Sequence, residues 1–199
     1  MVRLTLACLL GLMIAVQVEA QSSGSDVAPA VIEIETGAGL IVVELDTQNA
    51  PRTSANFLRY VATGLFDGGA FYRAVRLDNQ SVDDVTIEVI QGGINRERRD
   101  EAFDPIPMEG TGATGLLHLD GTLSMARAGP DSARGEFFIC LGDQPGLDEG
   151  GARNPDGRGF AAFGRVIEGM DVVRRIHRSE TEGQRLVEPV WINSVRMLR

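Results

Sequence analysis

The stretch GTLSMARAGPDSARGEFFICL, residues 121–141, determines the fold prediction for this chain. Its apolar run Thr122–Ala126 is followed by a Gly-Pro pair at 129–130, and a second apolar run begins at Phe137. Gly-Pro pairs mark turns, and short apolar runs on either side of a turn are typical of strands. The stretch therefore predicts two consecutive strands.

Two upstream blocks, FYRAV at 71–75 and VIQGG at 89–93, each place one polar side chain in an apolar run. These side chains are Arg73 and Gln91, and the glutamine precedes a pair of glycines. In this order and spacing, the three blocks resemble the cyclophilin family of peptidyl-prolyl isomerases. The resemblance covers about residues 30–199.

Apolar periodicity predicts the remaining elements. Val31–Glu35 alternates apolar and acidic residues, and a Gly-Ala-Gly turn leads to a second strand at Leu40–Asp46, which together predict a hairpin. Further strands are predicted at 70–76, 85–91, 122–127, 136–141, 160–166 and 189–198, and helices at 51–64 and 170–178. The pattern predicts a mainly β fold, a closed eight-stranded antiparallel barrel capped by two helices, whose interior side chains just fill it.

The first residues are typical of a targeting segment. Arg3 precedes an apolar run at 4–16, and Val18-Glu19-Ala20 is a small-residue cleavage pattern. We therefore expect a signal peptide at 1–20, a linker at 21–29, one domain at 30–199 and a periplasmic or secreted location. The alternative is an uncleaved anchor, but the run is shorter than the roughly 20 apolar residues that a spanning helix needs.

The net charge limits the expected binding partners, and the cysteine content limits the possible disulfides. Without residues 1–20, 18 arginines and 27 acidic residues give a net charge of −9. Such a surface repels nucleic acid and anionic membranes, so neither is expected as a partner, and we expect a monomer. Cys140 would be the only remaining cysteine, which excludes an intramolecular disulfide and favours a buried structural thiol.

Conventional catalytic patterns are missing. The two histidines, His118 and His177, fit no Ser/His/Asp or metal-ligand spacing and are expected to be structural or exposed. The acidic residues at 143–156 do not have the spacing of a calcium-binding EF-hand loop. No metal or cofactor is expected.

The family resemblance implies a reaction that needs neither. Rotation about an X–Pro bond has a barrier of roughly 20 kcal/mol, because the prolyl nitrogen lone pair is delocalised into the carbonyl. Lowering it requires an apolar pocket for the proline ring, a donor to the pyramidal nitrogen and groups that hold the flanking backbone. No nucleophile or general base is required.

The resemblance places this chemistry residue by residue. It implies that Arg73 is the catalytic arginine, although an isolated strand arginine is otherwise more typical of a surface ion pair. The substrate-binding residues that it implies are Gln91, Val89, Ala126, Arg127, Glu136, Phe138, Leu147 and Phe160.

Three positions depart from the family pattern. Glu88 and Gly146 stand where family members have pocket aromatics, and Glu136 stands where they have a glutamine. The carboxylates would hold Arg73 in an ion pair; alternatively, Glu136 orients Arg73 or pairs with Arg127. The predicted function is peptidyl-prolyl isomerisation that assists the folding of exported proteins with proline-containing segments. The alternative is a cyclophilin-like module that binds proline-containing peptides with weak or no catalysis.

Overall fold

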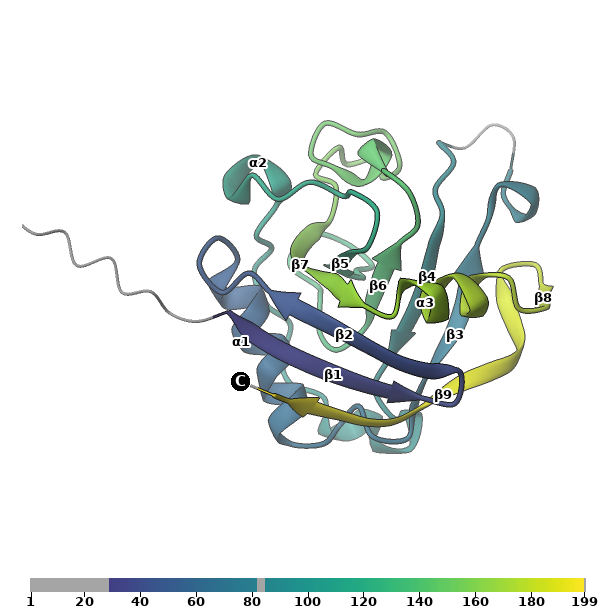
Figure 1. Cartoon of the computed structure of the whole chain (residues 1–199). Coiled ribbons are helices and arrows are strands. Elements are labelled where there is room, and N and C mark those ends of the chain that lie inside the picture. The colour runs from purple at the N-terminus through teal and green to yellow at the C-terminus, as the bar shows by residue number, and fades with distance from the viewer. Residues whose placement is uncertain (1–28, 82–84, 199) are drawn as a thin grey trace, which may run out of the picture.

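The computed structural model of the chain describes residues 29–81 and 85–198 (Figure 1). The predicted signal peptide and nearly all of the predicted linker lie outside these residues. The strands are β1 (Ala30–Thr36), β2 (Gly39–Leu45), β3 (Gly69–Val75), β4 (Val89–Gly93), β5 (Thr122–Met125), β6 (Phe137–Cys140), β7 (Ala161–Glu168), β8 (Thr181–Glu182) and β9 (Arg185–Met197).

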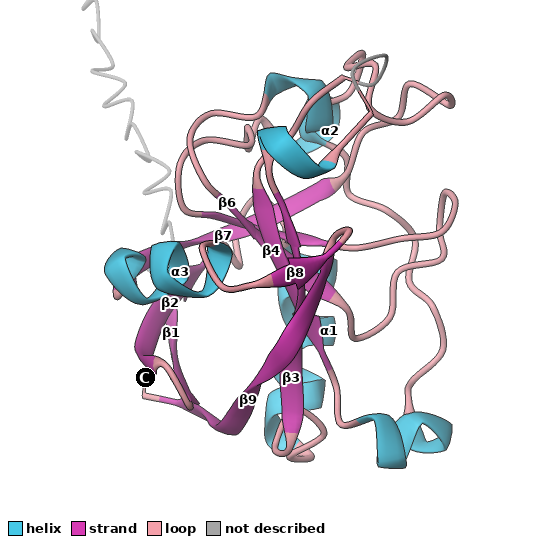
Figure 2. Cartoon of the chain, turned by 90° about the vertical axis from the view of Figure 1, so that its right-hand side faces the viewer, coloured by secondary structure: helices cyan, strands magenta, loops and turns pink. Residues whose placement is uncertain are grey.

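Eight of these strands close into a barrel. Their order is β1-β2-β7-β5-β6-β4-β3-β9, every pairing is antiparallel, and β9 also pairs with β1. Figure 2 shows β9 crossing from β3 towards β1 on the outside of the molecule. The remaining strand, β8, is a two-residue hairpin arm on β9 that the sequence did not predict. The predicted eight-stranded barrel is confirmed.

Two helices, α1 (Pro51–Ala62) and α3 (Met170–His177), cover the barrel. The other helical segments are the single turn α2 (Thr111–Thr114) and the 3-10 helices η1 (Leu77–Asn79), η2 (Arg96–Glu101) and η3 (Pro145–Leu147). Helix α1 contacts β7 and β9, whereas α3 contacts β2, β3 and β4. Helix α1 thus joins two strands that are not paired with each other, and α3 joins β2 to the β3–β4 pair, as expected for helices that lie across the barrel openings. The two predicted caps are confirmed.

A distant carboxylate helps to start α1. Pro51 is the first helical residue and has no N–H to satisfy. The Glu109 carboxylate accepts hydrogen bonds from the backbone nitrogens of Arg52 (3.1 Å) and Thr53 (2.7 Å). Glu109 thereby caps α1 and ties down the long connection between β4 and β5.

The barrel interior is a single apolar core. Helix α1 inserts Phe57 against Phe66, Phe137 and Phe163, with ring centroids 4.8–5.5 Å apart. These four rings are each at most 1% exposed. Burial of this aromatic cluster fixes the helix on the sheet and, with it, the closed end of the barrel.

Two predicted strand boundaries are wrong. Strand β4 begins at Val89, not at 85, because the Gln80 side chain binds both the N–H and the C=O of Ile87 and thereby replaces strand pairing there. Strand β9 begins at Arg185, four residues earlier than predicted, because it also forms the hairpin with β8.

A second, smaller cluster lies on the outer face of the barrel. Side chains alternate along β6, so Phe137 and Ile139 point into the barrel while Phe138 and Cys140 point outward. This outer cluster consists of Val75, Ile87, Val89, Phe138, Cys140 and Leu147, with Ala126 and Phe160 packed against it. No helix in the described part of the chain is long and apolar enough to cross a membrane.

Candidate active site

Strand register brings three predicted site residues into one row on the outer face. Arg73 on β3 stands opposite Gln91 on β4, and Gln91 stands opposite Phe138 on β6. Side chains directly opposite each other on antiparallel strands lie within contact distance. The row therefore joins a guanidinium, an amide and an aromatic ring.

A cavity of about 400 Å³ opens over this row. Every predicted site residue except Glu136 lines it, namely Arg73, Val89, Gln91, Ala126, Arg127, Phe138, Leu147 and Phe160. Ile87, Arg153 and Asn154 line it as well and were missed. The structure thus gathers residues from five separate parts of the chain around one hollow.

Arg73 is held by two neutral amides. Its Nη1 donates to Gln91 Oε1 (2.8 Å), and its Nε donates to Gln184 Oε1 (3.0 Å), which also accepts from Nη2. Burial, together with the positive charge of Arg153, lowers the pKa of Arg73, which nevertheless stays protonated at neutral pH. The alternative interpretation of Arg73 as a surface ion-pair residue is wrong, because its partners are uncharged glutamines.

The opposite wall of the cavity is aromatic. The ring of Phe138 meets Phe160 edge-on, with centroids 5.3 Å apart, and stacks on the His118 imidazole at 5.9 Å. His118 is itself fixed by Asp148 (2.7 Å) and by Ser124 (2.9 Å). His118 therefore supports the wall from behind and is buried, in agreement with a structural role.

Arg127 fastens the long 142–158 connection beside the cavity. Its guanidinium binds both carboxylate oxygens of Asp156 (2.7 and 2.8 Å) and the Gly159 carbonyl (2.8 Å). It also lies over the Phe160 ring, 5.2 Å from the centroid. Bidentate arginine–carboxylate pairs fix geometry as well as charge. The proposed pairing of Arg127 with Glu136 is therefore wrong.

The two unusual carboxylates do not contact Arg73. Glu136 accepts a hydrogen bond from the Tyr72 hydroxyl, and Glu88 lies 3.9 Å from the His177 ring. Neither residue lines the cavity. The expectation that these carboxylates hold Arg73 in an ion pair is wrong, so they give no support to a catalytically impaired module.

At the third unusual position, Val85 occupies the space of a side chain. A Cβ at Gly146 would lie 2.6 Å from Val85 Cγ1. The backbone carbonyl of Val85 in turn accepts from Arg153 Nη1 (2.9 Å). An apolar group from the segment before β4 thus stands against η3, where the family pattern has an aromatic residue.

Sequence reasoning missed Gln184, although it makes two hydrogen bonds to Arg73. Gln184 follows the Gly183 turn between β8 and β9, far from Arg73 in the sequence. A single polar residue in a turn has no periodicity or motif that would mark it. Only the pairing of β9 with β3 brings it to the site.

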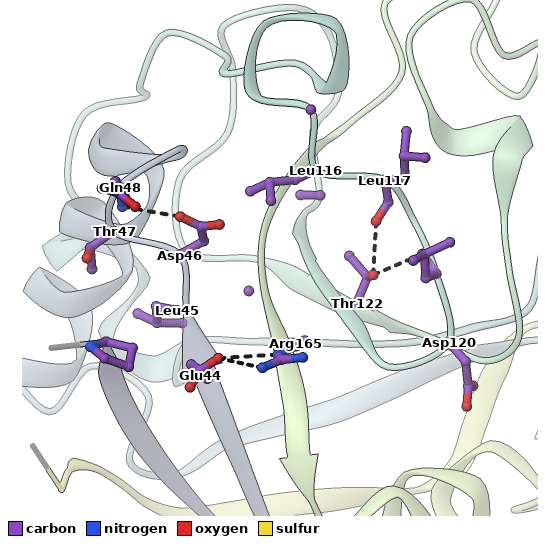
Figure 3. A pocket seen from close by; sticks show the side chains of 15 residues that line it. Glu44, Leu45, Asp46, Thr47, Gln48, Leu116, Leu117, Asp120, Thr122 and Arg165 are labelled. Atoms are coloured by element: carbon purple, nitrogen blue, oxygen red, sulfur yellow. Dashed lines mark hydrogen bonds and ion pairs between the residues drawn. The ribbon is translucent and has the colours of Figure 1, made fainter. Parts of the chain in front are cut away.

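A larger hollow of about 700 Å³ lies elsewhere, between residues 44–48 at the end of β2 and the segment 115–122 (Figure 3). An exposed Glu44–Arg165 ion pair (2.9 Å) borders it, and Thr122 donates to the Leu117 carbonyl beside it. No predicted site residue lines this hollow. Among the described residues, no group of histidine, cysteine or acidic side chains could hold a metal ion.

Comparisons with known proteins agree with the geometry. The family model described as cyclophilin type peptidyl-prolyl cis-trans isomerase/CLD matches residues 31–197. The chain is 36% identical to peptidyl-prolyl cis-trans isomerase cyp18 of Streptomyces antibioticus, over 84% of this chain and 98% of that protein. It is 35% identical to peptidyl-prolyl cis-trans isomerase A of Dickeya dadantii, over 75% and 72% respectively.

A solved structure matches the fold. It is a crystal structure of a Cryptosporidium parvum cyclophilin type peptidyl-prolyl cis-trans isomerase in the presence of the dipeptide Ala-Pro. The TM-score is 0.68 at 20% identity, and the match covers 85% of this chain and 99% of that one. At this identity, the likeness concerns the fold alone.

Proposed function

The chain belongs to the cyclophilin type peptidyl-prolyl cis-trans isomerase family, and from this premise we propose that it isomerises X–Pro bonds in the cavity around Arg73. Its activity is that of an isomerase acting on proline-containing peptides. The observation that supports the site is the juxtaposition of a fixed guanidinium and an aromatic wall across one cavity.

Arg73 would act as the donor to the prolyl nitrogen. A guanidinium has five N–H groups, and hydrogen bonds to Gln91 and Gln184 occupy three of them among the described residues. As the amide twists, the nitrogen becomes pyramidal and regains a lone pair that accepts a hydrogen bond. A donor fixed in advance stabilises that state more than the planar ground state.

The aromatic wall would bind the proline ring. Phe138 and Leu147 are nearly completely buried, whereas Phe160 is only partly buried at the cavity rim. Covering apolar surface stabilises a bound ring by about 25 cal/mol per Å². Gln91 lies between this wall and Arg73, where its amide can hold the substrate backbone.

Replacing Arg73 by alanine tests the site. We expect Arg73→Ala to lower kcat/KM for a proline tetrapeptide by about 100-fold, the loss typical for one preorganised transition-state donor. Arg165→Ala is the matched control, because Arg165 is an exposed arginine that forms an ion pair with Glu44 beside the larger hollow, away from the cavity. Wild-type activity of Arg73→Ala at an unchanged melting temperature would contradict the assignment.

The cellular role rests on the N-terminal pattern. We propose cleavage after Ala20, a short linker at 21–29 and a monomeric domain that assists the folding of exported proteins in the periplasm or outside the cell. Mass spectrometry of the protein from its native host should find a chain that starts at Gln21. A retained N-terminal segment in the membrane fraction would refute this proposal.

A further inference from the structure

A series of hydrogen bonds leads from Arg73 to Glu136, a partly buried carboxylate outside the cavity. Arg73 Nη1 donates to Gln91 Oε1 (2.8 Å), and Gln91 Nε2 donates to the Tyr72 hydroxyl oxygen (2.8 Å). The Tyr72 hydroxyl donates in turn to Glu136 Oε2 (2.5 Å). Three strands or their ends thus contribute to one continuous chain.

A β-bulge makes the chain geometrically possible. Phe71 pairs with Gly92 and Arg73 pairs with Gln91, so Tyr72 is an extra residue in β3. Regular alternation would point Tyr72 and Arg73 to opposite faces of the sheet. The bulge re-aims the extra side chain, and both residues therefore reach Gln91.

Gly93 leaves room for the Glu136 carboxylate. Glu136 precedes β6 and lies over Gly93, where a Cβ would collide with its carboxylate. Any larger residue at position 93 would push Glu136 away from Tyr72. The glycine in β4 and the bulge in β3 are two independent features that place the same hydrogen bond.

Arg73 and Glu136, at the two ends of this hydrogen-bond series, fix the direction of every hydrogen bond between them. A guanidinium only donates, and an ionised carboxylate only accepts. Because the single Tyr72 hydrogen goes to Glu136, the hydroxyl can only accept from Gln91. The Gln91 amide must then turn its nitrogen to Tyr72 and its oxygen to Arg73.

We propose that Glu136 and Tyr72 are positioning residues for Arg73. They hold the Gln91 amide in the one orientation that offers an oxygen to the guanidinium. Without the carboxylate, Tyr72 is free to donate to Gln91, and the turned amide then presents N–H groups to Arg73, which retains only Gln184. This proposal rests on the proposed role of Arg73 as the catalytic group.

The charge state of Glu136 controls the orientation of the Gln91 amide. Burial raises the pKa of Glu136, although the Tyr72 hydroxyl, Arg96 and Arg99 act in the opposite direction. Burial raises the pKa of Tyr60 and of Tyr72, and the negative charge of Glu136 adds to this effect. Because protonation removes the requirement that Glu136 only accepts, activity should fall as the pH drops through this raised pKa.

A double-mutant cycle tests the connection. We expect Glu136→Ala and Tyr72→Phe each to lower kcat, rather than to raise KM, by about threefold to tenfold, which corresponds to roughly 0.6–1.4 kcal/mol. The double variant should be no worse than the poorer single variant, because both act through the same amide. Glu88→Ala is the matched control, since that carboxylate lies beside His177 and takes no part in the hydrogen bonds between Arg73 and Glu136.

The pH profile separates positioning from a structural role. Wild-type kcat should decline on the acid side with a midpoint above the usual glutamate pKa of about 4.3. Glu136→Gln keeps an accepting oxygen but cannot titrate, so it should recover part of the activity and lack this decline. A wild-type profile without the decline would overturn the proposal even if the alanine variant failed to fold.

The outcomes distinguish the two proposals. If Arg73→Ala retains activity, the assignment of the active site fails. If Arg73→Ala is inactive while Glu136→Ala and Tyr72→Phe keep wild-type kcat at unchanged melting temperatures, the active site stands and the positioning role is refuted. Additive losses in the double variant would likewise refute a shared path through Gln91.

Discussion

The two faces of the same three strands, β3, β4 and β6, behave differently. Inside the barrel, Phe71, Phe137 and Ile139 are completely buried and belong to the large core. On the outer face, the small cluster around Phe138 borders a cavity and a row of hydrogen-bonded polar groups. The inner face is closed by packing alone, whereas the outer face is left partly unfilled.

This difference shows where the sheet can bind a substrate. Apolar side chains that pack to native density leave no room for another molecule. On the outer face, the small apolar cluster leaves space, and the partly buried Arg73 and Gln91 beside it supply directed hydrogen bonds. The inner face of each strand thus contributes to the core, and the outer face carries the proposed site, so neighbouring residues on one strand can be tested against each other.

The largest effect is expected at Phe137. Phe137→Ala should lower the free energy of unfolding by about 3–5 kcal/mol, because it opens a cavity among Phe57, Phe66 and Phe71. Denaturant unfolding measures this loss, and the activity per folded molecule should stay close to that of the wild type. A loss of activity in the folded fraction would show that the two faces are not independent.

At Phe138, the next residue on β6, a substitution should affect activity more than stability. Phe138→Ala should lower kcat/KM by about 10- to 100-fold, because the lost ring contact with proline is worth roughly 1–3 kcal/mol. Its loss of stability should be smaller than that of Phe137→Ala, since the ring borders a cavity that solvent can enter. Equal stability losses with unchanged kcat/KM would remove the distinction between the faces.

Lowering the pH should reduce the stability of the folded protein through His118, which packs behind Phe138. Burial lowers the pKa of His118, and the opposing effect of Asp148 is smaller. Between this lowered pKa and about 6.5, the unfolded chain binds the proton and the folded protein does not, so stability falls as the pH drops below about 6.5.

The slope can reach about 1.4 kcal/mol per pH unit for one proton. Unfolding at several pH values measures it, and His118→Gln is the control because an amide does not titrate. If the variant keeps the full slope of the wild type, His118 is not its source.

The smallest effect is expected at Cys140. Its side chain is completely buried on the outer face, and burial raises the pKa of the thiol. A thiol reagent should therefore modify the native protein on the order of 100-fold more slowly than the unfolded chain. Cys140→Ala should retain activity within about twofold, because the residue does not line the cavity. Rapid labelling of the native protein would mean that the outer cluster is not packed.

Period-two alternation predicted the barrel, and the resemblance to the cyclophilin family named Arg73, Gln91 and Phe138, which the strand register brings into one row. The expectation that Glu88 and Glu136 lie against Arg73 is wrong. Glu88 and Val89 are neighbours, but in an extended chain they point to opposite faces, so only Val89 reaches the cavity. Glu136 is instead bound by the Tyr72 hydroxyl, a contact that depends on the pairing of distant strands.

Other site features had no local signal. The bulge at Tyr72 interrupts alternation without any glycine or proline to mark it. Gln184 and Arg153 come from turns, where polar residues are expected for solvation alone. Their positions depend on long-range pairing and on the course of the connections, and neither can be read from a short window.

The pairing of β1 with β9 has a kinetic consequence. The first and last strands of the domain are neighbours, so the barrel has two open edges until β9 is in place. Contacts between residues this far apart in sequence slow folding, because a long loop must close before they form. A polypeptide that is still being synthesised can form the hairpin β1–β2 and the β5–β6 pair, but it exposes unpaired strand edges until residues 185–197 have been made. The barrel of this isomerase therefore cannot close until its last strand has been made.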